Sequence, residues 1–368
     1  MNQIREMISE GMDIINLGIG NPDISPPVEI IEELTCSIIG PGAHGYQPYR
    51  GTLELRNAIS DWYLKYFNVK ADPGKQILPL LGSKEGIMHI SMAFLNQGDA
   101  VLLPDPGYPA YASAAQLCDA RCVYYNLNAE NNWLPDIEGL KKKDLQGVKL
   151  MWINYPNMPS GRKAAKEDLL ALTDFARKYN ILIINDNPYS FILNNTPLSI
   201  LNADNTFENV LELNSLSKSH NMAGCRIGMV IGHEQHINDI LKVKSNMDSG
   251  MFLPLQMAAV KALSLGQDWY DQLNATYSIR QKIVYELLQH LGCSTDQGQS
   301  GMFLWSEIPA SFADSYEFSE HCLNSYHLFV VPGLVFGSRG QRYIRTSLSM
   351  NELRLKEAVN RVKTNNHD

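Results

Sequence analysis

The chain has 368 residues, more than one hydrophobic core usually supports, so two domains, or a large domain with a smaller lobe, are expected. Apolar residues make up 45% and charged residues 19%, a composition that argues against a disordered or coiled-coil chain. The formal net charge of -8 would repel nucleic-acid phosphates, and no stretch clusters Lys and Arg with aromatic residues. A nucleic-acid partner is therefore not expected.

No segment reads as a signal peptide or a membrane span. Residues 1–18 contain acids and lack a continuous apolar core, and no later segment approaches the length of apolar sequence that a spanning helix needs. We therefore expect a cytoplasmic protein with no membrane partner.

The cysteines and histidines do not form a recognisable metal or disulfide pattern. The six cysteines are scattered without a C-x-x-C, so neither disulfides nor structural zinc are supported, and most are expected to be buried thiols. His233 and His236 lie three residues apart in HEQH without further ligands nearby, so a solvated helix is expected there. No metal is predicted.

Short apolar runs alternate with helical patterns through the middle of the chain. Strands buried on both faces have such runs, and here they cover residues 76–82, 100–104, 149–154, 181–186 and 209–214. Residues 166–178 separate two of the runs and place Leu169, Leu172 and Ala176 on one helical face. This β-α-β alternation predicts an α/β fold with a mainly parallel sheet. From about Leu255 onward, long amphipathic helices predict a second lobe.

Polar residues follow each predicted strand, where an open parallel sheet binds its ligands. We expect one pocket to collect the segments 82–84, 105–108, 154–161 and 215–218, together with Asp186. Ordinary explanations also exist for single residues. Ser83 and Lys84 could form a plain strand-to-helix turn, Asp186 a helix cap and Tyr189 a core tyrosine.

A lysine close to an acid, a tyrosine, arginines and a phosphate-binding turn is what a pyridoxal phosphate site requires. The lysine amine condenses with the cofactor's aldehyde and moves protons at the substrate α-carbon, so it must be desolvated. The acid keeps the pyridine nitrogen protonated, which lets the ring accept electrons. The phosphate needs backbone N–H groups at a helix start, which Ser83 and Lys84 would supply before the predicted helix 85–95.

The segment SLSKSHNMAGCRIG (215–228) resembles the lysine segment of class I/II aminotransferases of fold type I. The resemblance implies that Lys218 holds pyridoxal 5'-phosphate as a Schiff base. It also implies that Ser215 and Arg226 bind the phosphate and that Ser217 supports the same turn. The match extends over nearly the whole chain, from INLGIGNPD (15–23) to the segment 331–349.

Other motifs of that family occur in the same order. GYQPYRGTLELR (45–56) implies that Tyr46 reaches the cofactor phosphate of a partner subunit, and hence a homodimer. DPGYPAY (105–111) implies that the Tyr108 ring stacks on the cofactor.

The substrate and the ring of the cofactor have matching residues too. Asp186 and Tyr189 correspond to the family's pyridinium partner and phenolic-oxygen donor. Arg345 in YIRTS corresponds to the arginine that grips the substrate α-carboxylate, which suits a planar bidentate donor, and Gly20 to a backbone contact with the same group.

One segment departs from the family pattern. NYPNMPSG (154–161) carries Met158 where an asparagine usually donates a hydrogen bond to the cofactor's phenolic oxygen. A thioether cannot donate this bond, so Tyr189 acts alone or Asn157 takes over, and Asn157 is a candidate cofactor ligand. A shifted pKa of the bound cofactor is expected, without loss of activity.

The resemblance also implies a domain plan and a reaction. We expect an N-terminal segment (1–35) packed with a small α+β domain (256–368), and a large cofactor domain (36–255) with a seven-stranded sheet. The reaction would transfer an amino group from an amino acid to a 2-oxo acid, usually 2-oxoglutarate. Segments 81–89 and 243–250 resemble the alanine and LL-diaminopimelate aminotransferase subgroup, which favours a small or dicarboxylic amino acid.

Several alternative functions share part of this pattern. β-Elimination enzymes acting on cystathionine-like substrates, and decarboxylases, use much of the same site. Ser215–Lys218 also fits the S-x-x-K of serine acyl-transferases, but their K-[ST]-G strand is not found. Gly18-Ile19-Gly20 lacks the third glycine of a nicotinamide site. Regulators with an aminotransferase-like domain carry a DNA-binding domain ahead of it, for which the match from Ile15 leaves no room.

Overall fold

The computed structural model describes residues 2–365 and has a seven-stranded sheet in its larger lobe. The strand order is β2-β8-β7-β6-β5-β3-β4, and β8 alone runs antiparallel to its neighbours. The prediction of a mainly parallel, seven-stranded α/β sheet is confirmed. The strands are β2 (Ile77–Leu80), β3 (Ala100–Asp105), β4 (Arg121–Asn126), β5 (Val148–Ile153), β6 (Leu182–Asp186), β7 (Val210–Ser215) and β8 (Gly228–Gly232).

Each apolar run that predicted a strand forms one, whereas β4 and β8 were not found from such runs. β4 is an edge strand whose side chains are mostly exposed or half-buried, so it has no continuous apolar pattern. β8 is a buried strand that begins at Gly228 and ends at Gly232, so only three apolar side chains lie between its glycines and no longer apolar run marks it.

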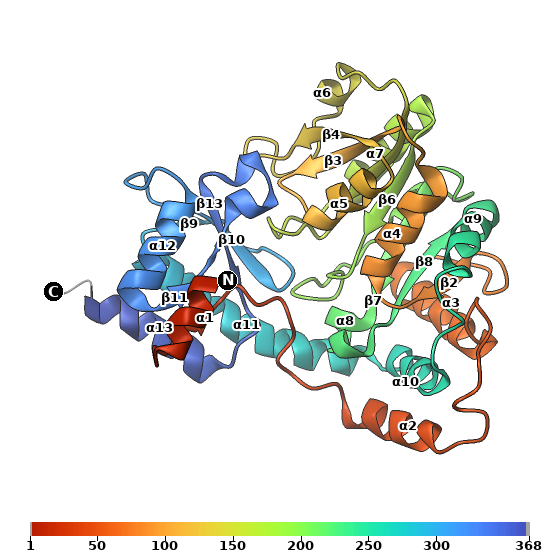
Figure 1. Cartoon of the computed structure of the whole chain (residues 1–368), viewed down its shortest axis with the longest axis horizontal. Coiled ribbons are helices and arrows are strands. Elements are labelled where there is room, and N and C mark those ends of the chain that lie inside the picture. The colour runs from red at the N-terminus through yellow and green to blue at the C-terminus, as the bar shows by residue number, and fades with distance from the viewer. Residues whose placement is uncertain (1, 366–368) are drawn as a thin grey trace.

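Helices cover both faces of this sheet (Figure 1). Alternate strand residues point to opposite faces, so Leu211 and Leu213 pack with one set of helices and Val210 with the other. The first set is α4 (Ser83–Phe94), α5 (Pro109–Leu117) and α9 (Glu234–Lys244). The second includes α3 (Leu53–Phe67) and α7 (Lys166–Tyr179). Burying each large apolar side chain contributes roughly 1.5–3 kcal/mol, so the sheet is a rigid platform for residues at its edge.

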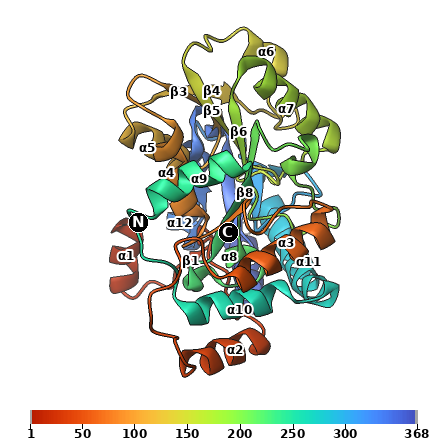
Figure 2. The same cartoon turned by 90° about the vertical axis from the view of Figure 1, so that its right-hand side faces the viewer.

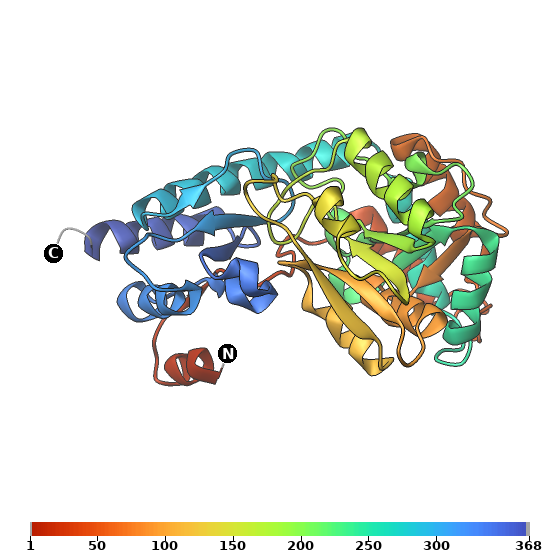
Figure 3. The same cartoon turned by 90° about the horizontal axis from the view of Figure 1, so that it is seen from above.

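The smaller lobe contains an antiparallel sheet and three long helices. Its strand order is β12-β13-β10-β9, and α11 runs from the larger lobe into it (Figures 1 and 3). The elements are β9 (Ser294–Thr295), β10 (Phe303–Glu307), β12 (Val331–Pro332), β13 (Tyr343–Ser347), α11 (Gln267–His290), α12 (Ser315–Tyr326) and α13 (Glu352–Asn365).

The N-terminal segment joins the smaller lobe through backbone pairing. β1 (Ile15–Asn16) lies parallel to β11 (Leu328–Phe329), and α1 (Asn2–Ser9) lies beside this lobe (Figures 1 and 3). Arg280 of α11 forms an ion pair of 2.6 Å with Asp23, which follows β1. These contacts join residues 15–23 to the smaller lobe, whereas residues 28–35 belong to a helix that packs elsewhere. The packing of the whole segment 1–35 with a small domain and the boundaries at residues 35 and 255 stay predictions.

The remaining helices lie around the larger lobe. α2 (Val28–Ile38) packs on α10 (Leu253–Leu263) at the outer side of the larger lobe (Figures 1 and 2). Short elements complete the chain: α6 (Ile137–Lys141), α8 (Leu216–Ser219), and the 3-10 turns at Ile200–Ala203, Ala223–Cys225, Gly333–Phe336 and Ser338–Gly340. Within residues 2–365, no helix has the length and apolar character needed to cross a membrane.

The cysteines differ from expectation, because most of them are not buried. All six are free thiols, but Cys322 alone is buried, Cys36 is exposed and the others are half-buried. The HEQH segment starts α9 with His233 as its cap, and a ring nitrogen of His236 lies 2.8 Å from the Glu208 carbonyl oxygen. Both histidines thus have ordinary structural contacts.

Candidate active site

A cavity of about 350 Å³ lies at the carboxyl ends of the parallel strands. β3, β5, β6 and β7 all end at this edge, and α4 begins there after β2. Except for Asn157 and Tyr46, all predicted site residues line the cavity. They are Gly20, Ser83, Lys84, Tyr108, Asp186, Tyr189, Ser215, Ser217, Lys218, Arg226 and Arg345.

Lys218 lies in α8, directly after β7, and points its amine into the cavity. The amine donates a hydrogen bond to the Gly20 carbonyl oxygen of the N-terminal segment. Burial, helped by the positive charges of Arg345 and Arg226, lowers the pKa of Lys218 to about 8. A substantial fraction of the amine is therefore neutral near physiological pH, which a nucleophile or general base needs.

Asp186 ends β6, the strand next to β7, and lines the same cavity. Its Oδ2 accepts a hydrogen bond of 2.8 Å from the Tyr111 hydroxyl, whereas its buried Oδ1 has no partner. Burial raises the pKa of Asp186 to about 7 although the Tyr111 hydrogen bond opposes the shift. A buried carboxylate with an unpartnered oxygen requires a cationic or N–H partner, which a protonated ring nitrogen would supply.

Two residues that support Asp186 were not predicted. Asn154 donates its side-chain amide to the Asp186 carbonyl oxygen and accepts the Met158 backbone N–H at 2.6 Å. Tyr111 stacks on Trp152 with ring centroids 4.8 Å apart. Tyr111 lies one helical turn after Tyr108, so its spacing could have identified it.

The start of α4 and the α8 turn form a wall rich in hydrogen-bond donors. Gly82 caps α4 with a φ of +89°, and a Cβ there would lie 2.4 Å from Arg226 Nη2. Only glycine lets the arginine approach the helix start so closely. The hydroxyls of Ser215 and Ser217 lie 2.8 Å apart on the same wall. A helix N-terminus, hydroxyls and an arginine together suit a phosphate group.

Arg345 on β13 provides a second cationic group at the other end of the cavity. Its Nη2 donates to the Gly18 carbonyl oxygen at 3.1 Å, and its guanidinium carbon lies 3.9 Å from the Phe303 ring centroid. Burial lowers the pKa of Arg345 to about 10, so the group stays charged at neutral pH. Its buried Nε has no hydrogen-bond partner, which leaves a donor for a carboxylate.

Met158 takes the place of the asparagine donor and contacts Arg345. Its sulfur lies 3.4 Å from Arg345 Nη1 and its side chain lines the cavity. A thioether accepts only weak hydrogen bonds, so this contact leaves the guanidinium largely available.

Tyr108 and Tyr189 both line the cavity and contact different aromatic rings. Tyr108 precedes α5, with its ring 5.6 Å from that of Tyr111, and burial raises its pKa. Tyr189 follows β6 and packs edge-on against Phe303, and burial also raises its pKa. Both hydroxyls therefore stay protonated at neutral pH and can donate hydrogen bonds.

Asn157 and Tyr46 lie outside the cavity. The side-chain oxygen of Asn157 accepts the Ser160 hydroxyl at 2.7 Å, and its amide donates to the Asn154 carbonyl oxygen at 3.2 Å. The side-chain oxygen and amide of Asn157 are thus both hydrogen-bonded within this turn, and Asn154 lines the cavity instead. Tyr46 is 92% exposed on the surface. Its predicted role concerns a partner subunit and stays a prediction.

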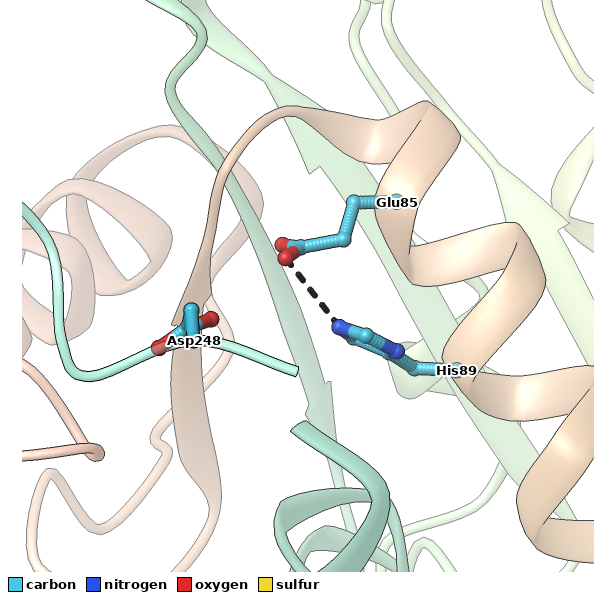
Figure 4. A group of neighbouring side chains, drawn as sticks. All are labelled: Glu85, His89 and Asp248. Carbon is cyan, nitrogen blue, oxygen red and sulfur yellow. Dashed lines mark ion pairs between the residues drawn. The ribbon is translucent and has the colours of Figure 1, made fainter. Parts of the chain in front are cut away.

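Behind the helix start lies a cluster of Glu85, His89 and Asp248 (Figure 4). Their ligand atoms lie within 4.8 Å of one another, and Glu85 Oε1 is 3.1 Å from His89 Nε2. The buried ammonium of Lys244 already pairs with Asp248, and Glu85 also accepts the Leu81 backbone N–H at 2.6 Å. Because Lys244 supplies the positive charge, the cluster is explained as a support for the α4 start.

The chain is similar over nearly its whole length to known aminotransferases. The chain is 38% identical to an LL-diaminopimelate aminotransferase of Dehalococcoides mccartyi, over 97% of this chain and 92% of the relative. The substrate-bound BacF structure from Bacillus subtilis superimposes with a TM-score of 0.93 at 35% identity, covering 99% of this chain and 93% of BacF. An aromatic aminotransferase from Pyrococcus horikoshii superimposes with a TM-score of 0.90 at 30% identity, covering 98% of both chains.

These relatives favour transamination over the β-elimination alternative. Residues 12–362 match the family of class I and II aminotransferases, which is nearly the whole chain. The protein therefore belongs to the class I and II aminotransferases, enzymes that transfer amino groups.

Proposed function

We propose that this aminotransferase binds pyridoxal 5'-phosphate in the cavity at Lys218 and moves the α-amino group of an L-amino acid to a 2-oxo acid. Enzymes of the family generally depend on this cofactor. The observation that carries the proposal is the unpartnered Oδ1 of Asp186, which is buried in the same cavity as the Lys218 amine. A cofactor with a basic ring nitrogen, an aldehyde and a phosphate matches the acid, the amine and the donor-rich wall in one molecule.

Each wall has a distinct task in this reaction. When bound, the cofactor supplies an electron sink for the substrate α-carbon. Asp186 holds a proton on the ring nitrogen, and Ser83, Ser215, Ser217 and Arg226 hold the phosphate, with Lys84 beside them. The Tyr108 ring would pack against the cofactor ring, and the Tyr189 hydroxyl would donate to its phenolic oxygen.

The substrate is oriented by groups at the opposite end. Arg345 binds the α-carboxylate and the backbone of Gly20 limits its position, so that the α-hydrogen faces Lys218. The Lys218 amine would remove this proton from the donor, and in the second half of the reaction the same amine would deliver a proton to the α-carbon formed from the 2-oxo acid acceptor. We propose 2-oxoglutarate as the usual acceptor and a cytoplasmic location.

Transfer of the nitrogen atom tests this function directly. The protein is loaded with pyridoxal phosphate and given ¹⁵N-labelled amino acids with 2-oxoglutarate or pyruvate as acceptor. We expect label in newly formed glutamate or alanine, and none above background in ammonia. Label that appears in ammonia together with pyruvate formed from the donor would instead indicate elimination.

The proposed homodimer rests on an apolar surface around the 39–49 loop. Ile39 is 85% exposed, Tyr46 92% and Phe252 38%, and the rings of His44 and Phe252 stack at 6.0 Å. A Cβ at Gly250 would lie 2.2 Å from the Gln47 carbonyl oxygen, so the two segments pack closely. Exposed apolar side chains grouped in this way mark a protein interface.

Substitution of Tyr46 tests the shared site. In Tyr46→Phe, loss of a hydrogen bond to the partner's phosphate should weaken cofactor binding about ten- to a hundredfold, because bonds to charged groups contribute roughly 1.5–3 kcal/mol. Visible titration with pyridoxal phosphate measures this effect. Tyr49→Phe, in the same loop, is the matched control and should bind normally. Equal affinities of both variants and wild type would contradict the shared site.

Substitution of Met158 tests how the phenolic oxygen is held. In Met158→Asn, a new donor to this oxygen should lower the pKa of the visible cofactor band by about one pH unit. Met158→Leu cannot donate either and should titrate like wild type. A midpoint that is the same in all three proteins would show that residue 158 does not contact the phenolic oxygen.

A further inference from the structure

A second cavity, of about 630 Å³, adjoins the first and shares Tyr108 and Arg345 with it. Its walls come from the N-terminal segment, the smaller lobe and the start of α5. They carry mainly apolar side chains, among them Ile4, Ile19, Leu323, Phe329, Val335 and Phe336. The cavity therefore begins where a substrate carboxylate would lie and continues into apolar surroundings.

Ile19 lies at the junction of the two cavities. The carbonyl oxygen before it, of Gly18, accepts Arg345 Nη2, and the one after it, of Gly20, accepts the Lys218 amine. The Ile19 side chain lines the second cavity and is 47% exposed. A substrate with its carboxylate on Arg345 and its α-carbon near Lys218 would thus place its side chain against Ile19.

Hydrogen bonds between the lobes fix the walls of this second cavity. The Gly107 N–H donates to the Phe336 carbonyl oxygen at 2.8 Å, and the Ser338 hydroxyl donates to Asp105 at 2.7 Å. Gly337 allows this approach, since a Cβ there would lie 2.1 Å from Asp105 Oδ1. Tyr108 and Phe336 are therefore held at set positions on either side.

The lining offers little for a charged side chain. Arg345 is the one basic residue among the described residues that line the second cavity, and the α-carboxylate would occupy it. The Asn16 side-chain oxygen already accepts the Gly18 N–H at 2.9 Å, and the Ser319 hydroxyl donates to Val330. The acid Glu320 is exposed. Within this chain, a second carboxylate in this cavity would lose hydration without gaining a cationic partner.

We propose that the donor amino acid of this enzyme has an uncharged apolar side chain, aliphatic or aromatic, which binds in the second cavity against Ile19. The proposal rests on the proposed function, because it uses Arg345 as the carboxylate site. It departs from the small or dicarboxylic donor that segments 81–89 and 243–250 favour, since those segments do not line this cavity.

Unreactive carboxylates test the side-chain preference without turnover. 3-Phenylpropionate, 4-methylpentanoate and glutarate are titrated calorimetrically into the cofactor-loaded enzyme. We expect the first two to bind at least about tenfold more tightly than glutarate. In Ile19→Asp, a charge in the apolar wall should weaken 3-phenylpropionate binding about ten- to a hundredfold. Leu353→Asp is the control, because Leu353 is 81% exposed on α13.

A reversal of charge preference provides a second, independent variant. Val335→Arg places a cation in the half-exposed wall of the second cavity. The affinity for glutarate relative to that for 3-phenylpropionate should therefore be about tenfold higher than in wild type. Stopped-flow reaction with L-phenylalanine, L-leucine, L-glutamate and LL-diaminopimelate should give the same order of preference as the inhibitors.

The outcomes separate this inference from the function on which it rests. Tighter glutarate binding in wild type, or an Ile19→Asp variant that binds 3-phenylpropionate normally, overturns the apolar donor while amino-group transfer to the cofactor can still be observed. A protein that forms no visible band with pyridoxal phosphate overturns both.

Discussion

Asp186→Asn is expected to stabilise the cofactor-free protein while nearly abolishing its activity. Without the cofactor, burial raises the pKa of Asp186 to about 7, from about 3.9 in a model peptide. Between these two values the folded state holds a proton that the unfolded state has lost, so stability decreases as the pH rises through this window. Above pH 7 the ionised carboxylate costs up to about 4 kcal/mol.

The neutral amide removes this cost, since Asn can still accept the Tyr111 hydrogen bond. Chemical denaturation of the cofactor-free protein at pH 8 should therefore show a higher unfolding free energy for Asp186→Asn, with the difference disappearing near pH 4. Asp61→Asn, at an exposed position, serves as the control and should change little. Equal stability of variant and wild type at pH 8 would mean that the carboxylate is not ionised in the empty site.

With the cofactor present the effect should be opposite. Removing one partner of a buried ion pair costs about 3–5 kcal/mol, which corresponds to roughly a hundred- to several-thousandfold loss of rate. Steady-state kinetics with saturating pyridoxal phosphate measures this loss. Asp186→Asn would then be more stable than wild type without the cofactor and nearly inactive with it. This result would show that the buried carboxylate lowers the stability of the cofactor-free protein and is needed for the reaction.

Arg345→Lys should lose substrate binding while keeping cofactor binding. Lysine conserves the charge, but its amine cannot form the two parallel hydrogen bonds that a planar guanidinium makes with a carboxylate. The contact of the guanidinium with the Phe303 ring, at 3.9 Å, would also be lost. We expect kcat/KM to decrease about a hundredfold or more, mainly through a higher KM, because the carboxylate contact exists before the chemical step.

Two measurements separate this effect from general damage. Visible titration should give the wild-type affinity for pyridoxal phosphate, because Arg345 lies at the other end of the cavity from the phosphate wall. Arg339→Lys, whose side chain is exposed, should retain normal kinetics. A lower kcat with an unchanged KM would contradict the assignment of Arg345 to the α-carboxylate.

Much of the large lobe could be predicted because buried parallel strands have a simple sequence pattern. The runs that form β3, β5, β6 and β7 end at the edge where polar residues follow, so the location of the site follows from the pattern and the topology together. β4 was not predicted because an edge strand exposes its side chains, and β8 was not predicted because glycines at both of its ends leave only three apolar side chains in a row.

The finer details of the site depend on side-chain geometry that spacing does not define. In NYPN (154–157), either asparagine could face the cavity. Asn154 does so because the hydroxyl and backbone N–H of Ser160 occupy the oxygen of Asn157. Phe303 reaches the site from the smaller lobe, more than a hundred residues from its neighbour Tyr189, and no local pattern indicates it.

Reduction with borohydride tests the central assignment most directly, because two lysines, Lys218 and Lys84, line the same cavity. The protein is incubated with pyridoxal phosphate, reduced, digested and analysed by mass spectrometry, in parallel with Lys218→Ala. We predict that the reduced cofactor is attached to Lys218 in wild type and that the variant carries no adduct. An adduct on Lys84, or equal labelling of wild type and Lys218→Ala, would contradict the assignment.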